Sequence, residues 1–457
     1  MSRYTSATDA DRREMLDAIG VGSLDEIFES EIPEEVRLRR PLDLPPGMAE
    51  QDVNDHLGKL AARNTHCDDE VSFLGAGMYD HYVPALIDSI ITRSEFLTPY
   101  TPYQPEISQG GLQVMFEFQT AISELTGLPV SNASMYEGPS SVASAGYLAK
   151  LETKRRRFVI SRGVHPHSRE TLATYAAGFG SEVVETPLDD AGATDVEALA
   201  AAVDDDTAAV FVQQPNFLGT VEDLGPLVEA GKCTGALVVC AADPLPLGIL
   251  EPPGSFGVDV CVGEGQSLGN RLDFGGPSFG FFAAQERYIR KMPGRIAGET
   301  VDAEGRRGFV LTLQTREQHI RREKATHNIC TSQALNALAG VIYLSWLGKR
   351  GVVELAELML RRTHYARETL GLERINPGPV VREFAVRVPD LDGLFARARD
   401  AGINPGYRLG RDYPEYEDGL LVAITERRTK TQIDQLAALC TKGSDPLSVG
   451  DSRGLTP

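Results

Sequence analysis

Residues Val258–Phe282, with the sequence VDVCVGEGQSLGNRLDFGGPSFGFF, say more about this chain than any other segment. The segment opens with the apolar run Val258–Val262, which is typical of a strand buried on both faces. It continues into the glycine-rich loop Gly263–Gly269 and reaches a second apolar run at Gly280–Ala283. Ligands of parallel sheets bind at the carboxyl ends of the strands. The segment therefore predicts a buried strand that presents the loop residue Gln266 at a ligand-binding edge.

Short apolar runs alternate with amphipathic segments over the middle of the chain. The predicted strands are Phe158–Ser161, Glu182–Glu185, Ala208–Gln213, Ala236–Ala242, Val258–Val262 and Gly280–Ala283. Helical periodicity lies between them at Ser168–Gly178, Asp195–Val203 and Gly225–Lys232, and an earlier helix begins near Gln113 and ends at Gly127. This alternation predicts an α/β domain with a mostly parallel sheet.

The chain is expected to have five parts. They are an N-terminal helical and extended segment (1–70), a large α/β domain (71–330), connecting helices (331–370), a small α+β domain (371–442) and a disordered tail (443–457). The connecting region shows helical periodicity at Asn328–Leu347 and Val352–Leu370. The small domain is predicted from strand, helix, strand and helix patterns at Glu383–Val388, Asp390–Ala401, Leu420–Ile424 and Lys430–Leu439.

Composition excludes several classes of protein. With 65 acidic and 45 basic residues the formal charge is −20, which argues against nucleic acid or an anionic membrane as partner. The chain has no uninterrupted apolar run of about 18 residues, so we expect no membrane span. The six cysteines are scattered without metal-ligand spacing, which argues against a metal site and favours a reducing, cytoplasmic setting.

The residues around Gln266 are typical of a site for pyridoxal phosphate (PLP), which needs an anion cradle, a ring support, a carboxylate for the pyridine nitrogen and a lysine. Gly138, Ser140 and Ser141 are the candidate cradle at a helix N-terminus; an ordinary capped helix is the alternative. His165 follows a predicted strand and is the candidate ring support; a hydrogen-bonded core or surface histidine is the alternative. Asp243 ends another predicted strand and is the candidate carboxylate, with a turn aspartate as the alternative.

The lysine of such a site is missing. Gln266 stands where the amine is needed, and a glutamine cannot form an imine. The nearest lysines, Lys232 and Lys291, lie at a predicted helix end and in a basic turn, so neither is placed to replace it. We expect this chain to be one half of an enzyme, with a degenerate, cofactor-like pocket of its own.

Two further segments are unusual. Thr98–Gly110 carries three prolines and predicts a stiff, extended arm that lines a shared interface or wraps its own domain. The segment Arg316–Thr331 predicts a charged, solvated helix followed by a polar turn; alternatively, Arg321 and Arg322 face an anionic partner.

Several motifs resemble the glycine cleavage system P-protein family, and specifically the amino-terminal half that many prokaryotes make as a separate subunit 1. The resemblance covers nearly the whole chain. The motifs are SFLGAGMYDHYVPALI (Ser72–Ile87), YTPYQPEISQG (Tyr100–Gly110), SNASMYEG (Ser131–Gly138), SRGVHPHSRETL (Ser161–Leu172), VGEGQSLG (Val262–Gly269), KMPGRIAGETVDAEGRRGFVLTLQTREQHIRREKATHNICTSQALNAL (Lys291–Leu338) and AITERRTK (Ala423–Lys430).

The resemblance implies fold type I of the PLP-dependent enzymes, the aspartate-aminotransferase architecture. It also implies that subunit 2 carries the lysine and PLP in an α2β2 assembly, which decarboxylates glycine and passes the aminomethyl group to the lipoyl arm of H-protein. This chain is then expected to supply a wall of its partner's site through Tyr100, Tyr103, Gln104 and Glu106 of the arm and through Tyr79 and His81. A pure scaffold and an independent PLP enzyme are the rival interpretations.

Overall fold

The computed structural model describes residues 6–40 and 42–441, which divide by their internal contacts into two units, Met1–Thr65 and His66–Pro457. In the first unit the helices are α1 (Asp9–Ile19), α2 (Leu24–Glu31) and α3 (Glu50–Ala61), with a short 3-10 turn, η1 (Glu34–Val36), between α2 and α3. None of the described side chains of α1, α2 or α3 is buried. The five-part division expected from the sequence stays a prediction, and its tail, 443–457, lies outside the described residues.

A seven-stranded sheet forms the centre of the second unit within the described residues, in the order β2-β8-β7-β6-β5-β3-β4. The strands are β2 (Val130–Ser131), β3 (Arg157–Ser161), β4 (Glu182–Thr186), β5 (Thr207–Gln214), β6 (Leu237–Ala242), β7 (Val260–Glu264) and β8 (Gly280–Ala284). Strands β3 to β7 run parallel to their neighbours among themselves, whereas β8 is antiparallel to both β7 and β2. The expected mostly parallel α/β sheet is confirmed. β7 begins two residues later than expected, because its pairing with β6 starts at Val260.

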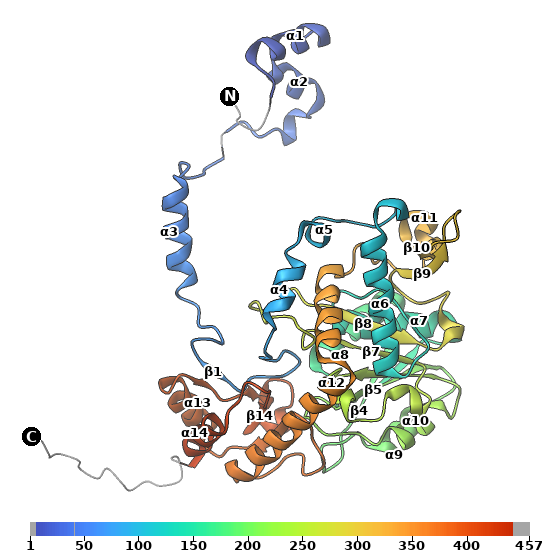
Figure 1. The fold of residues 1–457 in the computed structure, drawn as a ribbon, viewed down its shortest axis with the longest axis vertical. Helices are drawn as coiled ribbons and strands as arrows, with labels where there is room; N and C mark the ends of the chain where they lie inside the picture. The colour runs from blue at the N-terminus through green and yellow to red at the C-terminus, as the bar shows by residue number, and fades with distance from the viewer. Residues whose placement is uncertain (1–5, 41, 442–457) are drawn as a thin grey trace, which may run out of the picture. The chain divides into compact units, whose positions relative to one another are not determined.

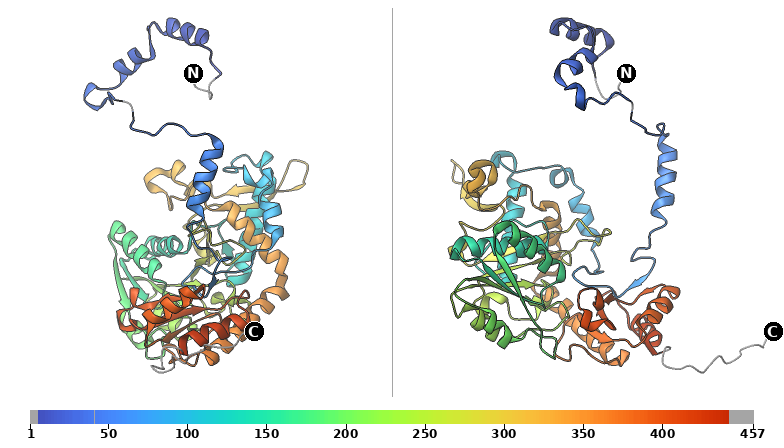
Figure 2. Two further views of the ribbon diagram at one scale, coloured as in Figure 1. Left: turned by 90° about the vertical axis from the view of Figure 1, so that its left-hand side faces the viewer. Right: turned by 180° about the vertical axis from the view of Figure 1, so that it is seen from behind.

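Both faces of this sheet are covered. Val238 packs with one buried cluster and the next residue, Val239, packs with another, as expected for side chains that alternate along a strand. The covering helices include α6 (Gln109–Thr126), α7 (Gly138–Thr153), α8 (Pro166–Phe179), α9 (Val196–Ala202) and α10 (Leu224–Lys232). α6 ends at Gly127, which adopts the left-handed conformation predicted for a helix C-cap. Figures 1 and 2 show helices on both sides of the sheet.

The connecting helix α12 (Ala334–Leu370) leads to the small domain. Its helical geometry breaks at Gly348 (φ 61°), between the two helices that the sequence predicts. The predicted start at Asn328 is wrong, because the backbone reverses at Ser332 (φ 53°) before the helix begins. The small domain has a three-stranded antiparallel sheet of β11 (Glu383–Arg387), β14 (Gly419–Ala423) and β13 (Tyr407–Arg408), with helices α13 (Leu391–Asp400) and α14 (Lys430–Thr441).

A short parallel pair joins the start of the second unit to the small domain: β1 (Val71–Ser72) pairs with β12 (Ile403–Asn404). The chain then passes through α4 (Ala85–Ile91), α5 (Ser94–Leu97) and the 3-10 turn η2 (Pro105–Ile107) into α6. An antiparallel hairpin, β9 (Ile296–Val301) and β10 (Arg307–Thr312), precedes the charged segment. Among residues 6–40 and 42–441 no helix has the length and apolar character to cross a membrane, and no cluster of three or more His, Cys, Asp or Glu side chains could hold a metal ion.

Two expectations about local structure need correction. The Arg316–Thr331 segment is not one solvated helix: it holds the short turns η6 (Gln314–Arg316), α11 (Gln318–Arg321) and η7 (Arg322–Lys324), because Arg316 is buried and bonds the carbonyl of Met292. The Thr98–Gly110 arm is not extended throughout. It forms η2 and enters α6 at Gln109, where the Gln109 side chain donates to Pro105 O.

Candidate functional site

The candidate cofactor residues gather at the carboxyl edge of the central sheet, as predicted. His165 follows β3, Asp243 follows β6 and Gln266 follows β7. A segment from the start of the second unit, Leu74–His81, contacts His165 and Gln266; we call it the strap. Gly77 marks its closest approach, because it adopts a φ of +98° and any Cβ there would stand 2.7 Å from His165 Nε2.

The side-chain amide of Gln266 bonds both backbone groups of one strap residue, Tyr79. Its Oε1 accepts from Tyr79 N (2.8 Å), and its Nε2 donates to Tyr79 O (3.1 Å) and to Asn270 O (2.8 Å). The side chain is 1% exposed. Its amide donors and acceptor therefore bond backbone groups of the same chain. The residue in the lysine position is a structural link between the sheet and the strap.

A carboxylate of this chain, that of Glu264, occupies the candidate anion cradle. The Glu264 carboxylate accepts from Gly138 N (2.9 Å), from Gln266 N (3.1 Å) and from the Ser278 hydroxyl. Gly138 N is one of the N–H groups at the N-terminus of α7 that have no partner within the helix, and a phosphate would bind at such groups. Burial raises the pKa of Glu264 to about 7, so the group titrates near neutrality.

The hydroxyls expected in the cradle point elsewhere. Glu137 caps α7: its carboxylate accepts from Ser140 N (2.9 Å). The hydroxyls of Ser140 and Ser141 both donate to Glu137 O, at 3.3 and 2.7 Å. This geometry is that of an ordinary capped helix, which is the alternative that the sequence left open.

His165 bonds the strap and its own helix. Its Nε2 donates to Ala76 O (2.8 Å), and its Nδ1 accepts from His167 N (3.1 Å). The ring meets Phe217 edge-on, with centroids 4.9 Å apart. Burial lowers the pKa of His165 to about 4, so the imidazole is neutral at pH 7. The ring is a hydrogen-bonded core histidine, again the alternative reading.

Asp243 has a cation partner in place of a pyridinium. Arg382, 3% exposed and just before β11, makes an ion pair with it at 2.5 Å. The guanidinium carbon of Arg382 lies 3.3 Å from the centroid of the Tyr79 ring, and the Tyr79 hydroxyl donates to Glu383 (2.7 Å). Arg382 and the Tyr79 ring thus occupy the space beside Asp243 where a cofactor ring is expected.

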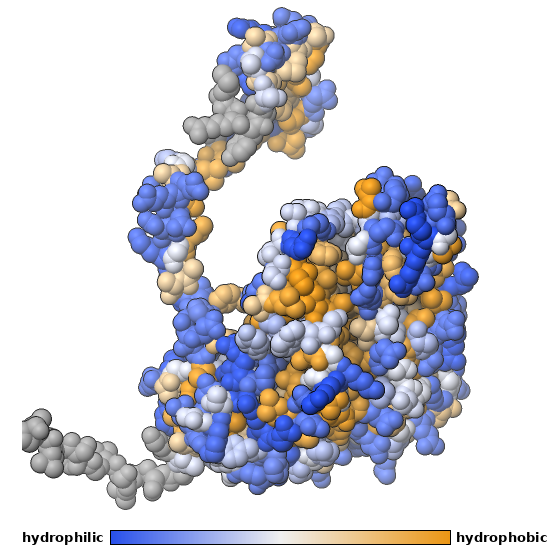
Figure 3. All heavy atoms as spheres, viewed as in Figure 1, coloured by the Kyte–Doolittle hydropathy of each residue, from blue (hydrophilic) through white to orange (hydrophobic). Residues whose placement is uncertain are grey.

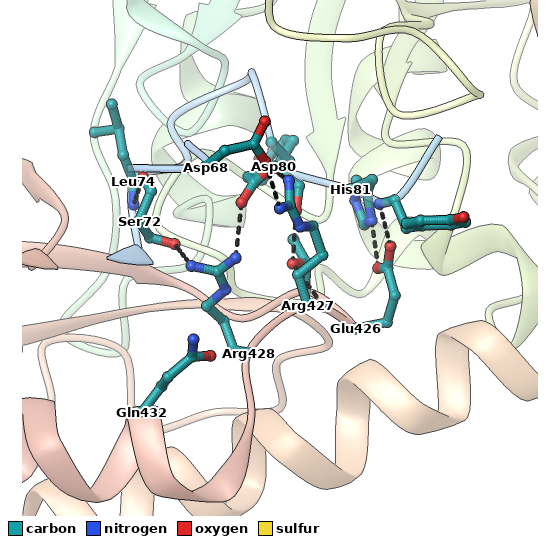
Figure 4. A network of polar contacts seen from close by, with 12 residues as sticks. Asp68, Ser72, Leu74, Asp80, His81, Glu426, Arg427, Arg428 and Gln432 are labelled. Atoms are coloured by element: carbon teal, nitrogen blue, oxygen red, sulfur yellow. Dashed lines mark hydrogen bonds and ion pairs between the residues drawn. The ribbon is translucent and has the colours of Figure 1, made fainter. Parts of the chain in front are cut away.

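Charged residues of the small domain anchor the strap (Figure 4). Asp80 bonds Arg427 and Arg428, the latter at 2.7 Å, and Arg428 also donates to Ser72 O (2.9 Å). His81 Nδ1 lies 2.6 Å from the Glu426 carboxylate. These partners belong to the Ala423–Lys430 motif, so that motif and Ser72–Ile87 are spatial neighbours.

Taken together, these contacts leave no fit for PLP in this chain. Glu264 fills the cradle expected for the phosphate, Arg382 and Tyr79 lie where the ring is expected, and Gln266 stands where the lysine is expected. Lys232 and Lys291 cannot substitute, since they pair with Asp259 and Glu152 away from the sheet edge. We therefore derive no chemical step at this pocket.

The residues expected to form an interface wall separate into two groups. Tyr79 and His81 are 8% and 6% exposed, because they pack inside this chain's own pocket, and their assignment to an interface wall stays a prediction. The arm residues Tyr100, Tyr103, Gln104 and Glu106 are on the surface, and Tyr100 is 79% exposed. Their role stays a prediction.

Three residues of the site were missed from the sequence. The sequence does give a signal for Glu264, because an acidic side chain two positions before Gln266 does not suit a phosphate cradle. No local sequence pattern could indicate Arg382 or Glu426, since each is more than 300 positions from the strap residue that it contacts.

Comparisons with known proteins agree with this architecture. Residues 2–440 match the family described as "Glycine cleavage system P-protein". A "Probable glycine dehydrogenase (decarboxylating) subunit 1" of Carboxydothermus hydrogenoformans is 51% identical over 440 residues, covering 95% of this chain and 98% of that protein. A crystal structure of glycine decarboxylase (P-protein) of the glycine cleavage system, in inhibitor-bound form, superposes with a TM-score of 0.88 at 42% identity, over 97% of this chain and 100% of that one.

A more distant likeness bears on the fold alone. A Lactobacillus brevis glutamate decarboxylase is 14% identical with a TM-score of 0.68, over 89% of this chain and 95% of that one. The expected class, fold type I of the PLP-dependent enzymes with a small α+β domain, is confirmed. The matched motifs, the fold and the length of the relatives agree, and the chain belongs to the glycine cleavage system P-protein family.

Proposed function

We propose that this chain is the lysine-less subunit of a glycine-decarboxylating enzyme of the glycine cleavage system. A second subunit, in an α2β2 assembly, supplies the lysine and holds PLP. The observation that carries the proposal is the filled pocket, because Gln266 and Glu264 bond the chain's own backbone where a cofactor would bind. When bound, PLP supplies the electron sink that lets glycine lose its carboxyl group as CO2. The aminomethyl product passes to the lipoyl arm of H-protein in the cytoplasm.

The contribution of this chain is a wall and a docking face. On the face of the second unit seen in Figure 3, apolar side chains gather over α4 and the first half of α12, and Leu86 of α4 is 45% exposed. Exposed apolar patches and tyrosines are typical of protein interfaces. The arm follows directly along the chain with Tyr100 and Ile107, which are 79% and 77% exposed. This continuity supports a partner that covers the patch and the arm together.

The structure provides an anchored position for one arm residue. The Tyr103 hydroxyl accepts from Arg295 Nη2 (3.0 Å) and donates to Glu317 (3.3 Å), so the ring is held while 42% of the residue stays exposed. A held aromatic ring on a surface costs little entropy when a partner or substrate covers it. We propose that Tyr103 and Glu106 border the partner's active site.

The test uses the assembled enzyme. Tyr103→Ala and Glu106→Ala are expected to lower the turnover of glycine–bicarbonate exchange about tenfold or more, the size typical for a lost positioning contact. Glu124→Ala on the exposed face of α6 serves as the matched control and is expected to leave turnover unchanged. Size-exclusion chromatography checks that the complex still assembles.

The two rivals predict other outcomes. If this chain is a pure scaffold, the arm variants assemble less of the complex, and each assembled complex keeps its turnover. An independent PLP enzyme binds the cofactor alone, shows an imine absorbance band and keeps a borohydride-reduced label on one of its own lysines. Unchanged kinetics in both arm variants contradict the proposed wall.

A further inference from the structure

Away from the filled pocket, the charged segment after β10 borders two adjoining cavities. One, of about 230 Å³, lies against α7 and α8; the other, of about 470 Å³, lies beside Tyr103 of the arm. The cavities share Gln318, Arg322 and Asn328 as walls. Cavities of this combined size accommodate small organic molecules.

The smaller cavity contains a buried histidine without a partner. His327 is 9% exposed, and neither of its ring nitrogens makes a hydrogen bond to any residue that the structure describes. The neighbouring Thr326 hydroxyl is also unbonded within the described chain. Burial and the charges of Arg316 and Arg295 lower the pKa of His327 to about 4, so the ring is neutral at pH 7. Buried polar groups are normally bonded, and an exception points to a missing ligand or a strained site.

The larger cavity is lined by two arginines, Arg295 and Arg322, and by two glutamates, Glu317 and Glu323. Arg295 is 2% exposed and lines it, and its Nε has no hydrogen-bond partner in residues 6–40 and 42–441. Glu317 is the buried carboxylate of this lining and lies 3.8 Å from Arg295. The unbonded Nε of Arg295 is a buried charged donor that an anionic group would satisfy.

Part of the wall of the smaller cavity is aromatic. Tyr147 and Phe179 lie with ring centroids 4.7 Å apart, and Tyr175 meets Phe179 edge-on. Such a wall suits a flat or apolar molecular body, while His327 and Arg322 suit its charged end. An aromatic surface together with a few polar groups that lack a partner is the usual composition of a small-molecule site.

We propose that these cavities bind a small organic anion, a carboxylate or a phosphate ester with a flat apolar body, whose charged group is received by Arg295, Arg322 and His327. The inference does not depend on the proposed function, because it concerns cavities of this chain alone and is tested without a partner. It also gives Arg322 the anionic contact that the sequence left open.

The experiment titrates the full-length isolated chain with acetate, inorganic phosphate, benzoate and phenyl phosphate at constant ionic strength, with binding followed by calorimetry and by the shift in Tm. Saturable binding that is tighter for the aromatic member of a pair supports the proposal. A preference for benzoate assigns a carboxylate, and a preference for phenyl phosphate assigns a phosphate ester. The absence of saturable binding for all four overturns it.

Two pairs of variants separate binding from folding. His327→Phe replaces the imidazole by a slightly larger apolar ring and removes nitrogens that bond nothing in the described chain, so we expect an equal or higher Tm without ligand and a loss of affinity of about tenfold or more. Arg322→Gln is expected to weaken binding about threefold to tenfold, whereas Arg321→Gln, which changes an exposed neighbour outside both cavities, leaves it unchanged. Equal affinities of Arg322→Gln, His327→Phe and the unaltered chain contradict the assignment.

Discussion

Replacing Gln266 by lysine tests whether the pocket of this chain has room for a cofactor. If only the amine were missing, Gln266→Lys would create a PLP site. If the pocket is filled, the new lysine finds Tyr79 and Asn270 in place of an aldehyde and the chain loses stability. The two outcomes are opposite in both binding and stability.

The size of the loss follows from the contacts of Gln266. The Tyr79 N–H loses its acceptor, and a buried unsatisfied donor costs about 1–3 kcal/mol. The lysine ammonium in a position that is 1% exposed costs several kcal/mol more in desolvation, partly offset by the carbonyls of Tyr79 and Asn270. We expect the free energy of unfolding to fall by roughly 3–5 kcal/mol.

Urea unfolding followed by circular dichroism gives the stability, and borohydride reduction with PLP followed by peptide mass spectrometry gives the adduct. Gln113→Lys, on the exposed face of α6, is the control and is expected to change stability by less than about 0.5 kcal/mol. A Gln266→Lys chain that is as stable as the unaltered protein and carries reduced cofactor at position 266 would refute the filled pocket.

Two further predictions concern the groups that replace the cofactor. Because burial raises the pKa of Glu264 to about 7 from its ordinary 4.5, the folded chain keeps a proton that the unfolded chain releases. The free energy of unfolding therefore falls as pH rises from 4.5 to about 7, by about 1.4 kcal/mol per pKa unit, and Glu264→Gln flattens that slope in urea titrations. Burial raises the pKa of Glu383 to about 7 as well, so part of the slope remains; a slope identical to that of the unaltered chain would count against the account. Arg382→Met leaves the partly buried Asp243 carboxylate without its cation partner and is expected to cost about 3 kcal/mol, most of which Asp243→Asn recovers in the same chain. Additive losses in this double-mutant cycle would show that the two side chains are not coupled.

Local pattern predicted the sheet well. The strand runs around Val210 and Val239 are continuously apolar because both faces of the sheet are covered, and Gly127 ends α6 as its position indicates. The same patterns predict that His165, Asp243 and Gln266 lie at one edge of the sheet, since the carboxyl ends of parallel strands meet there. The single solvated helix predicted for Arg316–Thr331 is wrong, because the local sequence does not reveal that Arg316 is buried.

The filling of the pocket could not be predicted in the same way. Gln266 contacts Tyr79 across 187 positions, and Arg382 contacts His81 across 301. Such contacts depend on where the strap crosses the sheet edge, and periodicity describes only neighbours within an element. The sequence shows a glutamine where an amine is expected; the structure adds that Glu264 and Arg382 bond other groups of this chain where further cofactor contacts are expected.

The most direct measurement of the central claim locates PLP in the assembled enzyme. The complex with the lysine-bearing partner is loaded with PLP, reduced with borohydride and digested, and the labelled peptide is identified by mass spectrometry. The label is expected on a lysine of the partner, with this chain unlabelled both in the complex and alone. Reduced cofactor on Lys291, Lys232 or any other lysine of this chain would contradict the account.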